Sequence, residues 1–380
     1  GDVDISANYR IGYTRVDGPD FVTAGGTQAD LFDESVTHSA TVRAGTRPGQ
    51  PLPVGIGVGA GYYQEDVSNL DQRVRDAYVR GDVTVPISPT LAVVAGAGVE
   101  DVEVSSRDAV RDAAGDPVIG SDGRFVTDES SPRIIAYEAS GLIWDVGVVW
   151  TPSRRTRLEA HFGHRYDSET FYGNFSWRPS SRSNLQIGVY DGIQGFGGRL
   201  NNALAQLPTD FTVTRDPVTG EITGCVTTLD GSGCLDGLLG SVRSSVFRGR
   251  GVTASYSRRI GRMTAGIGAG YDRRKFIGAP GTVLALADGI VDESYYVTAG
   301  LSGPVGQRGS FSINTFANWF DSGTAGVGDV RSIGSSASYT EQVMRNLSAR
   351  AAVAISTLDS DIAPDNFTTA SALLGLRYDF

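Results

Sequence analysis

The chain has 380 residues, which is long enough for two or three ordinary domains or for one large barrel. Its net charge of −10 argues against nucleic acid as a partner, because nucleic-acid-binding surfaces are basic. No run of residues approaches the roughly 20 apolar positions that a transmembrane helix needs. That does not exclude membrane strands, because alternating apolar and polar residues average to a neutral hydropathy.

The start of the chain and its two cysteines indicate a compartment. The sequence opens at Gly1 with neither Met nor an apolar leader, so we predict a mature chain whose signal peptide has been removed. Cys225 and Cys234 are the only cysteines and lie close together in one Gly-rich segment. An even, local pair in an envelope protein predicts a disulfide, with two free thiols in a reducing cytosol as the alternative.

Alternation of apolar and polar residues recurs along the chain in segments of about ten residues bounded by turn residues. It predicts sixteen strands, at 3–15, 36–46, 53–63, 77–87, 91–103, 134–151, 155–167, 170–178, 182–194, 246–259, 262–276, 291–303, 309–321, 331–341, 346–358 and 367–380. Helical periodicity is limited to a short stretch near 200–207. Since no linker or change of composition interrupts the series, we expect a single domain over 1–380.

The connections between these strands alternate in length. Short turns rich in Pro, Gly, Ser and Asn are expected at 47–51, 88–90, 152–154, 179–181, 260–262, 304–307 and 344–346. Longer links fall between them at 17–35, 64–76, 104–133, 195–245, 277–290, 322–330 and 359–366, and only the link near 167–169 is brief. Short turns at one end and long loops at the other are typical of an outer-membrane barrel. The longest loop, 195–245, either folds into the mouth of the barrel or stands over it.

Two of the long links contain Asp-Pro turns. The turns lie at 116–120 and 216–220, and each predicts a small hairpin projecting from the barrel.

The two faces of the predicted strands differ in chemistry. In 142–150, every second residue is large and apolar from Leu142 to Trp150, whereas Asp145 lies on the opposite face. Trp150 and Trp177 each precede a Pro-Ser turn, where an aromatic girdle at the membrane interface is expected. Tyr13, Tyr62, Tyr166 and Tyr271 lie near the long-loop ends, where the second girdle is expected.

The polar face carries many arginines. The residues that we predict to line a pore are Arg80, Asp145, Arg155, Arg157, Glu159, His161, Arg165 and Arg178. Most carboxylates are instead expected in loops, among them Glu65, Asp101, Glu103 and Asp292. A basic interior would favour anions. The alternative, given equal weight, is a set of inward salt bridges that brace the wall.

Catalytic and cofactor motifs are missing from the sequence. There is no Gly-x-Ser-x-Gly, HExxH or CxxC pattern, and the three histidines are His38, His161 and His164. The Gly-rich runs near 55–61 and 266–270 alternate with apolar residues and lack the strand-turn-helix setting of a phosphate loop. We therefore expect no enzyme activity, no cofactor and no metal site.

The last strand carries the most specific resemblance. Residues 367–380 alternate up to a terminal Phe380. This resembles the closing strand of bacterial outer-membrane β-barrels, which implies recognition by the barrel-insertion machinery. The stretch from Phe171 to Ser183 is similar to β-barrel porins of proteobacteria that accompany exopolysaccharide or surface-protein systems. The resemblance carries over no functional residue.

The resemblance implies an all-β, transmembrane, antiparallel up-and-down barrel of about sixteen strands. Such a barrel would lie among outer-membrane lipids with both termini in the periplasm. The first functional hypothesis is a passive channel for small anionic or sugar-like solutes. The second is a non-conducting barrel whose extracellular loops bind a surface polysaccharide or a partner protein. The sequence leaves open whether the barrels form homo-oligomers.

Overall fold

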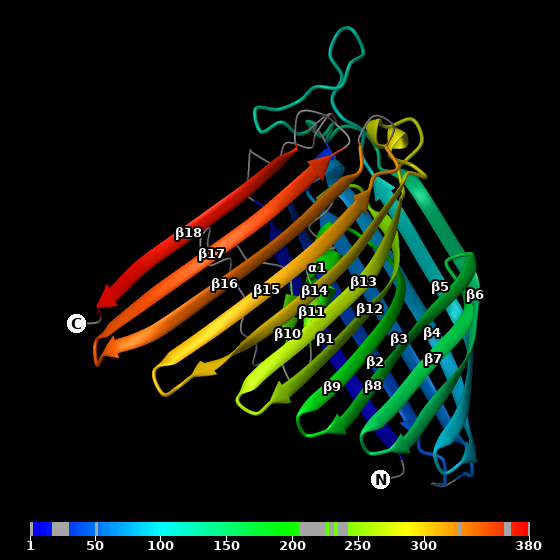
Figure 1. Ribbon diagram of the computed structural model, residues 1–380. Coiled ribbons are helices and arrows are strands. Elements are labelled where there is room, and N and C mark those ends of the chain that lie inside the picture. The colour runs from blue at the N-terminus through cyan, green and yellow to red at the C-terminus, as the bar shows by residue number, and fades with distance from the viewer. Residues whose placement is uncertain are drawn as a thin grey trace.

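The computed structural model describes residues 3–16, 30–49, 52–205, 225–227, 232–234, 242–324, 328–360 and 366–378. One 16-stranded antiparallel sheet dominates the fold, and its strands follow one another in chain order (Figure 1). They are β1 (Val3–Arg15), β2 (Glu34–Thr46), β3 (Gly55–Val67), β4 (Gln72–Ser88), β5 (Leu91–Ser106), β6 (Ile134–Ser153), β7 (Thr156–Arg165), β8 (Ser168–Ser180), β9 (Ser183–Gln194), β12 (Phe247–Ile260), β13 (Met263–Phe276), β14 (Val291–Val305), β15 (Gly309–Asp321), β16 (Val330–Met344), β17 (Leu347–Ser360) and β18 (Phe367–Tyr378).

Smaller elements lie in the links. The strands β10 (Cys225–Thr227) and β11 (Ser232–Cys234) form a separate pair between β9 and β12. The α-helix α1 (Phe196–Ala205) follows β9, and the 3₁₀ turns η2 (Asn69–Asp71) and η3 (Val283–Leu286) precede β4 and β14. No helix in the described part of the chain is long and apolar enough to cross a membrane.

Each of the sixteen predicted strands corresponds to a strand of the sheet. The predicted helix is also present, but α1 starts at Phe196 rather than near residue 200. Phe196 is almost fully buried and its ring packs on that of Phe32, with centroids 5.0 Å apart. The start of the helix is therefore set by a tertiary contact that helical periodicity alone does not reveal.

The two sides of the sheet have opposite chemistry. Along β6, the side chains of Leu142, Val146 and Val148 are 68%, 49% and 37% exposed, whereas Ile143 and Asp145 are each 5% exposed. Residues directly opposite each other in a ladder share a face, so this pattern extends to the neighbouring strands. We call the side bearing Leu142 the outer face and the side bearing Asp145 the inner face.

The ends of the sheet are β1 and β18. Within the described residues no ladder joins these two strands, and Figure 1 shows β15–β18 splayed away from β1–β6. Unpaired backbone groups on such edges are costly in hydrocarbon, where only helices and closed barrels satisfy every group. The membrane-inserted form of this sheet is therefore the barrel in which the β1 and β18 edges are paired.

The connections alternate much as predicted, with one correction. The link between β3 and β4 spans only 68–71, because both strands extend beyond the predicted ends of 63 and 77. In Figure 1, β1 starts and β18 ends on the side of the short turns, while the β5–β6 link projects from the opposite end.

The first predicted Asp-Pro hairpin also needs correction. The described turns in the β5–β6 link lie at 112–115 and 120–123, on either side of Pro117. The segment 216–220 lies outside the described residues.

Packed side chains fill much of the long-loop end. One hydrophobic cluster joins the inner face of β4–β6 to the turn after β7 and to the end of β9. Its members are Val74, Val102, Val104, Ala139, Tyr166, Ile193 and Val246. A second cluster, of Phe32, Val67 and Phe196, holds α1. The mouth of the sheet is thus narrowed by packed side chains rather than lined only by solvated loops.

Candidate functional site

The inner face of β2–β7 carries a chain of ion pairs. Arg80 donates from Nε and Nη2 to Asp145, with both donor–acceptor distances 2.7 Å. Nδ1 of His161 lies 2.8 Å from Oδ2 of the same carboxylate, the oxygen that also accepts from Arg80 Nη2. Arg43 donates to both oxygens of Asp82 at 2.7 Å, and Arg80 lies 3.6 Å from that carboxylate. These groups alternate in sign, so their charges largely cancel.

The same chain extends along β7. Nη2 of Arg157 donates to Glu159 at 2.8 Å, and Nε2 of His161 lies 3.5 Å from that carboxylate. The rings of His161 and Tyr172 are stacked, with centroids 4.7 Å apart. Residues at every second position of β7 thus form one polar row, as their parity predicts.

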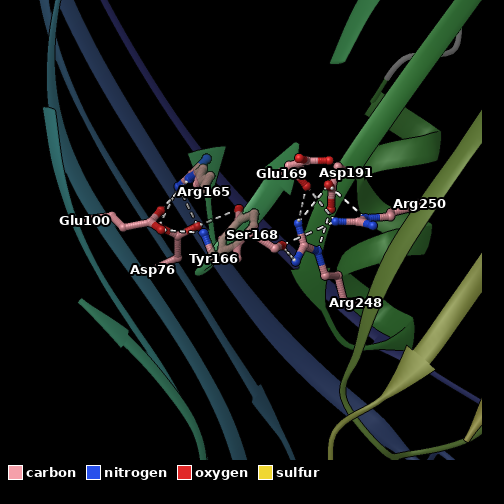
Figure 2. Close-up of polar contacts among 9 residues, drawn as sticks. All are labelled: Asp76, Glu100, Arg165, Tyr166, Ser168, Glu169, Asp191, Arg248 and Arg250. Carbon is pink, nitrogen blue, oxygen red and sulfur yellow. Dashed lines mark hydrogen bonds and ion pairs between the residues drawn. The ribbon is translucent and has the colours of Figure 1, made fainter. Parts of the chain in front are cut away.

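A second cluster surrounds the turn between β7 and β8. Arg165 donates from Nε to Glu100 at 2.7 Å and from Nη2 to Asp76 at 2.8 Å (Figure 2). The backbone N–H of Tyr166 donates to Glu100 at 2.6 Å, and its hydroxyl donates to Asp76 at 3.1 Å. Burial raises the pKa of the Tyr166 phenol further above its ordinary value.

This turn is tight. Tyr166 and Asp167 both have positive φ, 57° and 50°, as a two-residue hairpin turn requires. Tyr166 is only 5% exposed and packs inside the mouth. The prediction that Tyr166 belongs to the interfacial girdle is therefore wrong, because the β7–β8 hairpin directs it onto β4 and β5.

A third cluster lies on the other side of the hairpin. Arg248 donates to both oxygens of Asp191 at 2.8 and 2.9 Å, and Arg250 donates to the same carboxylate at 3.0 Å. Both guanidinium groups also contact the start of β8, where Arg250 Nη2 donates to the Glu169 carbonyl at 2.7 Å and Arg248 Nη1 donates to Ser168 Oγ (Figure 2). The short β7–β8 hairpin is thus held on both sides by arginine–carboxylate contacts.

The helix α1 is anchored to the inner face of the sheet through Glu65. This carboxylate is fully buried and accepts hydrogen bonds from the backbone N–H groups of Gly195 and Gly198, at 2.7 and 2.8 Å. The Tyr63 hydroxyl donates to it at 2.7 Å. A Cβ at Gly198 would lie 1.9 Å from that hydroxyl, so only glycine permits this close approach.

The rest of α1 spans the inner face. Asn201 donates to Thr37 of β2 at 3.2 Å. Arg199 lies over the Tyr190 ring, 3.9 Å from its centroid, and 3.7 Å from Asp272 of β13. Because α1 contacts strands from both halves of the sheet, the described start of the 195–245 loop lies in the mouth.

The pore-lining residues predicted from the sequence fall into three places. Arg80, Asp145, Arg157, Glu159 and His161 are brought together. Arg165 belongs to the separate cluster at the β7–β8 turn. Arg155 lies in the short turn after β6 and donates to the Pro179 carbonyl at 3.4 Å, while the backbone N–H of Arg178 donates to Arg155. These last two arginines therefore lie at the short-turn end, away from the packed mouth.

Sequence parity identified Asp145 and Glu159 as carboxylates of the polar face, but it missed other carboxylate partners. The expectation that Glu65, Asp101, Glu103 and Asp292 belong to loops is wrong. Glu65 lies in β3, beyond the predicted strand end at 63, and the other three lie in β5 and β14, inside the predicted strands 91–103 and 291–303. The partners it did not identify are Asp76, Glu100 and Asp191. For Asp76, an available signal was that 72–76 continues the alternation of its strand, whereas Glu100 and Asp191 already lay inside the predicted strands 91–103 and 182–194.

Two of the three predicted girdle and closing residues, Trp150 and Trp177, lie in the described part of the chain. Trp150 and Trp177 are on the outer face, 39% and 42% exposed, next to short turns. Phe380 lies outside the described residues. Nor does the described part of the chain contain a group of three His, Cys, Asp or Glu residues that could hold a metal ion.

The two cysteines face each other in the backbone register. Cys225 of β10 is directly opposite Cys234 of β11. Opposite residues of an antiparallel pair have Cα atoms about 4.5–5.5 Å apart, which lies within the range that disulfides span. Their side chains are outside the described part of the structure, so the disulfide stays a prediction.

A cavity of about 570 Å³ lies beside the β7–β8 hairpin. Residues lining it from the inner face include Arg80, Asp145, Glu159, Tyr172, Asn174 and Tyr190. Others, including Trp144, His164 and Val189, belong to the outer face. The cavity therefore reaches both sides of the sheet.

Comparison with known proteins finds similarity in fold only. No protein-family profile and no curated protein sequence matches the chain. Similar solved structures include the copper transporter OprC, the OmpT loop L8 deletion mutant of Vibrio cholerae and an anion-selective porin from Comamonas acidovorans. Their identities are 9%, 9% and 10%, with TM-scores of 0.39, 0.32 and 0.30.

The matches differ in extent. The match to OprC covers 91% of this chain but 56% of the transporter, so the chain spans little more than half of that protein. The OmpT mutant is matched over 100% of this chain and 99% of its own, and the porin over 100% of both. At these TM-scores we transfer no activity from any of them.

The architecture itself defines the class of protein. One up-and-down antiparallel sheet of 16 strands has an apolar outer face, a charged inner face, short turns at one end and longer links at the other. This is the fold of an integral outer-membrane β-barrel.

Proposed function

We propose that the protein is an outer-membrane channel for small polar solutes. The observation that carries this proposal is the inner face, where Arg43, Arg80, Asp82 and Asp145 form a continuous polar row opposite an apolar outer face. Charged side chains on the inside of a barrel are stable when the interior holds water. Passive diffusion through such an interior needs neither a cofactor nor catalysis.

The contacts favour sugar-like solutes over anions. Arg80, Arg157 and Arg165 each have a carboxylate partner within 2.8 Å. A guanidinium group whose charge is balanced at this distance attracts a passing anion only weakly. We therefore propose a channel with little charge selectivity, in which hydroxylated solutes exchange hydrogen bonds with the polar row.

The position of α1 supports a narrow channel. The helix is bound to Glu65 on β3 and reaches Asp272 on β13, so it crosses part of the mouth. A mouth narrowed in this way would admit solutes below a sharp size limit.

Planar-bilayer conductance and liposome swelling in sugars of increasing size test the channel. We expect discrete conductance steps and swelling that stops at a definite sugar size. Glu65→Ala, which removes the acceptor for the α1 backbone, should raise both the conductance and the size limit. Glu103→Ala, a carboxylate on the outer face of β5, is the matched control and should change neither.

The alternative is a non-conducting barrel whose loops bind a surface polysaccharide or a partner protein. The packed clusters in the mouth and the projecting β5–β6 link favour it. A folded wild-type protein and a folded Glu65→Ala variant that are both silent in bilayers would support this alternative and contradict the channel.

We further propose that both termini are periplasmic and that the insertion machinery reads the last strand. The common position of the start of β1 and the end of β18 on the short-turn side supports this orientation. Protease treatment of intact cells and of spheroplasts, with epitope tags at each terminus, tests it. Cleavage of either tag in intact cells would contradict it.

A further inference from the structure

The wall of the sheet is interrupted between β8 and β9. Their ladder begins at Gly173 opposite Val189 and runs toward the short turn. On the long-loop side of that pair, 168–172 of β8 pairs only with β7, and 190–194 of β9 pairs only with β12, within the described ladders. Two strand edges therefore face each other there without a ladder between them.

The cavity lies at this interruption. Its lining includes Gly173 and Val189, the last paired residues, and Tyr172 and Tyr190, the first residues beyond them. Open strand edges within a membrane wall need water or a bound polar group to satisfy their backbone. The guanidinium of Arg250 already satisfies one backbone carbonyl of the β8 edge, because its Nη2 donates to the Glu169 carbonyl at 2.7 Å.

The two sides of the cavity differ in polarity. Toward the outer face it is bordered by Trp144 and Val189, both about 40% exposed on the side that meets lipid, and by the imidazole of His164. Asp191 shares this face with Val189, but its charge is neutralised by Arg248 and Arg250. Toward the inner face it is bordered by the carboxylates and hydroxyls of Asp145, Glu159 and Tyr172. A molecule that fills the cavity would need an apolar part on the outside and a hydrogen-bonding part on the inside.

The charges in the cavity are already balanced. Asp145 is paired with Arg80, and Asp191 with Arg248 and with Arg250. Burying a further charge beside these pairs would require a partner that the cavity does not supply. Hydroxyl groups, which both donate and accept, match carboxylates and phenols without adding charge.

We propose that this cavity is a lateral binding site for an amphiphile with an uncharged, hydroxylated head and a single alkyl chain. The head lies against Asp145, Glu159 and Tyr172, while the chain leaves past Trp144 and Val189 into the membrane. The interruption between β8 and β9 is the opening through which the molecule enters from the lipid. The site does not depend on a conducting lumen.

Binding of tritiated octyl-β-glucoside to the full chain in phospholipid nanodiscs tests the site. Retained label is measured by equilibrium dialysis below the critical micelle concentration, with protein-free nanodiscs as the background. We expect saturable binding above that background. Octyl phosphate and octyltrimethylammonium should compete less well than unlabelled octyl-β-glucoside.

Two matched pairs of variants locate the binding. Val189→Trp fills the outer side of the cavity and should abolish saturable binding, whereas Val252→Trp lies directly opposite on β12, does not line the cavity and should keep it. Trp144→Ala should raise the Kd by about tenfold. Trp177→Ala removes an equally exposed tryptophan elsewhere on the outer face and should leave the Kd unchanged.

The folding of each variant is checked by its heat-modifiable migration in gels. If Val189→Trp does not fold, the site is tested by the Kd values of Trp144→Ala and of its control Trp177→Ala. Three results would each overturn the proposal. The wild type could show no saturable binding, or both variants of a pair could lose the same amount of binding. Alternatively, octyl phosphate or octyltrimethylammonium could compete better than unlabelled octyl-β-glucoside. None of these outcomes depends on whether the protein conducts, so a silent barrel would leave this test intact.

Discussion

Arg80 and Asp145 form a bidentate ion pair across the inner face, from β4 to β6, with both hydrogen bonds 2.7 Å long. Their side chains are 18% and 7% exposed. Because little water reaches this pair, loss of one partner leaves a charge that is poorly solvated. The pair therefore contributes to the stability of the wall as well as to its charge balance.

The stability of this pair can be compared with that of an exposed pair of the same length. Arg47 and Asp4 lie 2.7 Å apart, but their side chains are 76% and 62% exposed. We expect Asp145→Asn to destabilise the barrel by about 3–5 kcal/mol. We expect Asp4→Asn to cost less than about 1 kcal/mol.

Urea titration of both single variants in liposomes measures the difference. A double-mutant cycle with Arg80→Gln should give a coupling energy of about 1–3 kcal/mol for the buried pair. Equal effects at Asp145 and Asp4 would mean that water fills the space around Arg80 and screens both pairs alike.

The outer face makes a separate prediction about depth in the membrane. Val148 lies on the outer face of β6 and is 37% exposed. Val148→Arg should cost about 2–4 kcal/mol if this position is near the bilayer midplane. Asn174→Arg, on the inner face of β8, should cost much less because its guanidinium can reach water. Similar costs for the two, by urea titration in liposomes, would contradict the assignment of the faces.

The sequence predicted the strands well because their order is local information. A period of two and the turn residues between strands are enough to place the sixteen strands of the large sheet and to assign Asp145 and Val148 to opposite faces, but they did not predict the short pair β10 and β11. It could not identify the partner of Arg165, because Asp76 and Glu100 lie far away in the chain and meet it only when the sheet curls. The separation of β8 and β9 beyond Gly173 also depends on contacts between residues far apart in the chain, so the sequence did not reveal it.

The cysteine pair makes a prediction that does not depend on the barrel. With Cys225 opposite Cys234, the bond would close a short hairpin, for which the chain-entropy model gives roughly 2–3 kcal/mol of local stabilisation. Reduction should loosen the loop and leave the 16-stranded sheet folded. Maleimide labelling of unreduced native outer membranes should leave both cysteines unlabelled. Labelling of both before reduction would show that no bond is present.

The last prediction concerns ion selectivity and uses the pair of Arg157 and Glu159 on β7, which are 2.8 Å apart. Glu159→Gln leaves the guanidinium unbalanced and should move the reversal potential under a salt gradient toward anion preference. Arg157→Gln should move it toward cation preference, because the carboxylate is then unbalanced.

The double variant Arg157→Gln/Glu159→Gln should return the potential close to that of the wild type. Glu103→Gln, on the outer face of β5, is the control and should have no effect. If Arg157→Gln alone shifts the potential while Glu159→Gln does not, the arginine is not neutralised in the open channel and the lumen is anion-selective. If no variant moves the potential of a conducting barrel, this row braces the wall and the ions pass elsewhere.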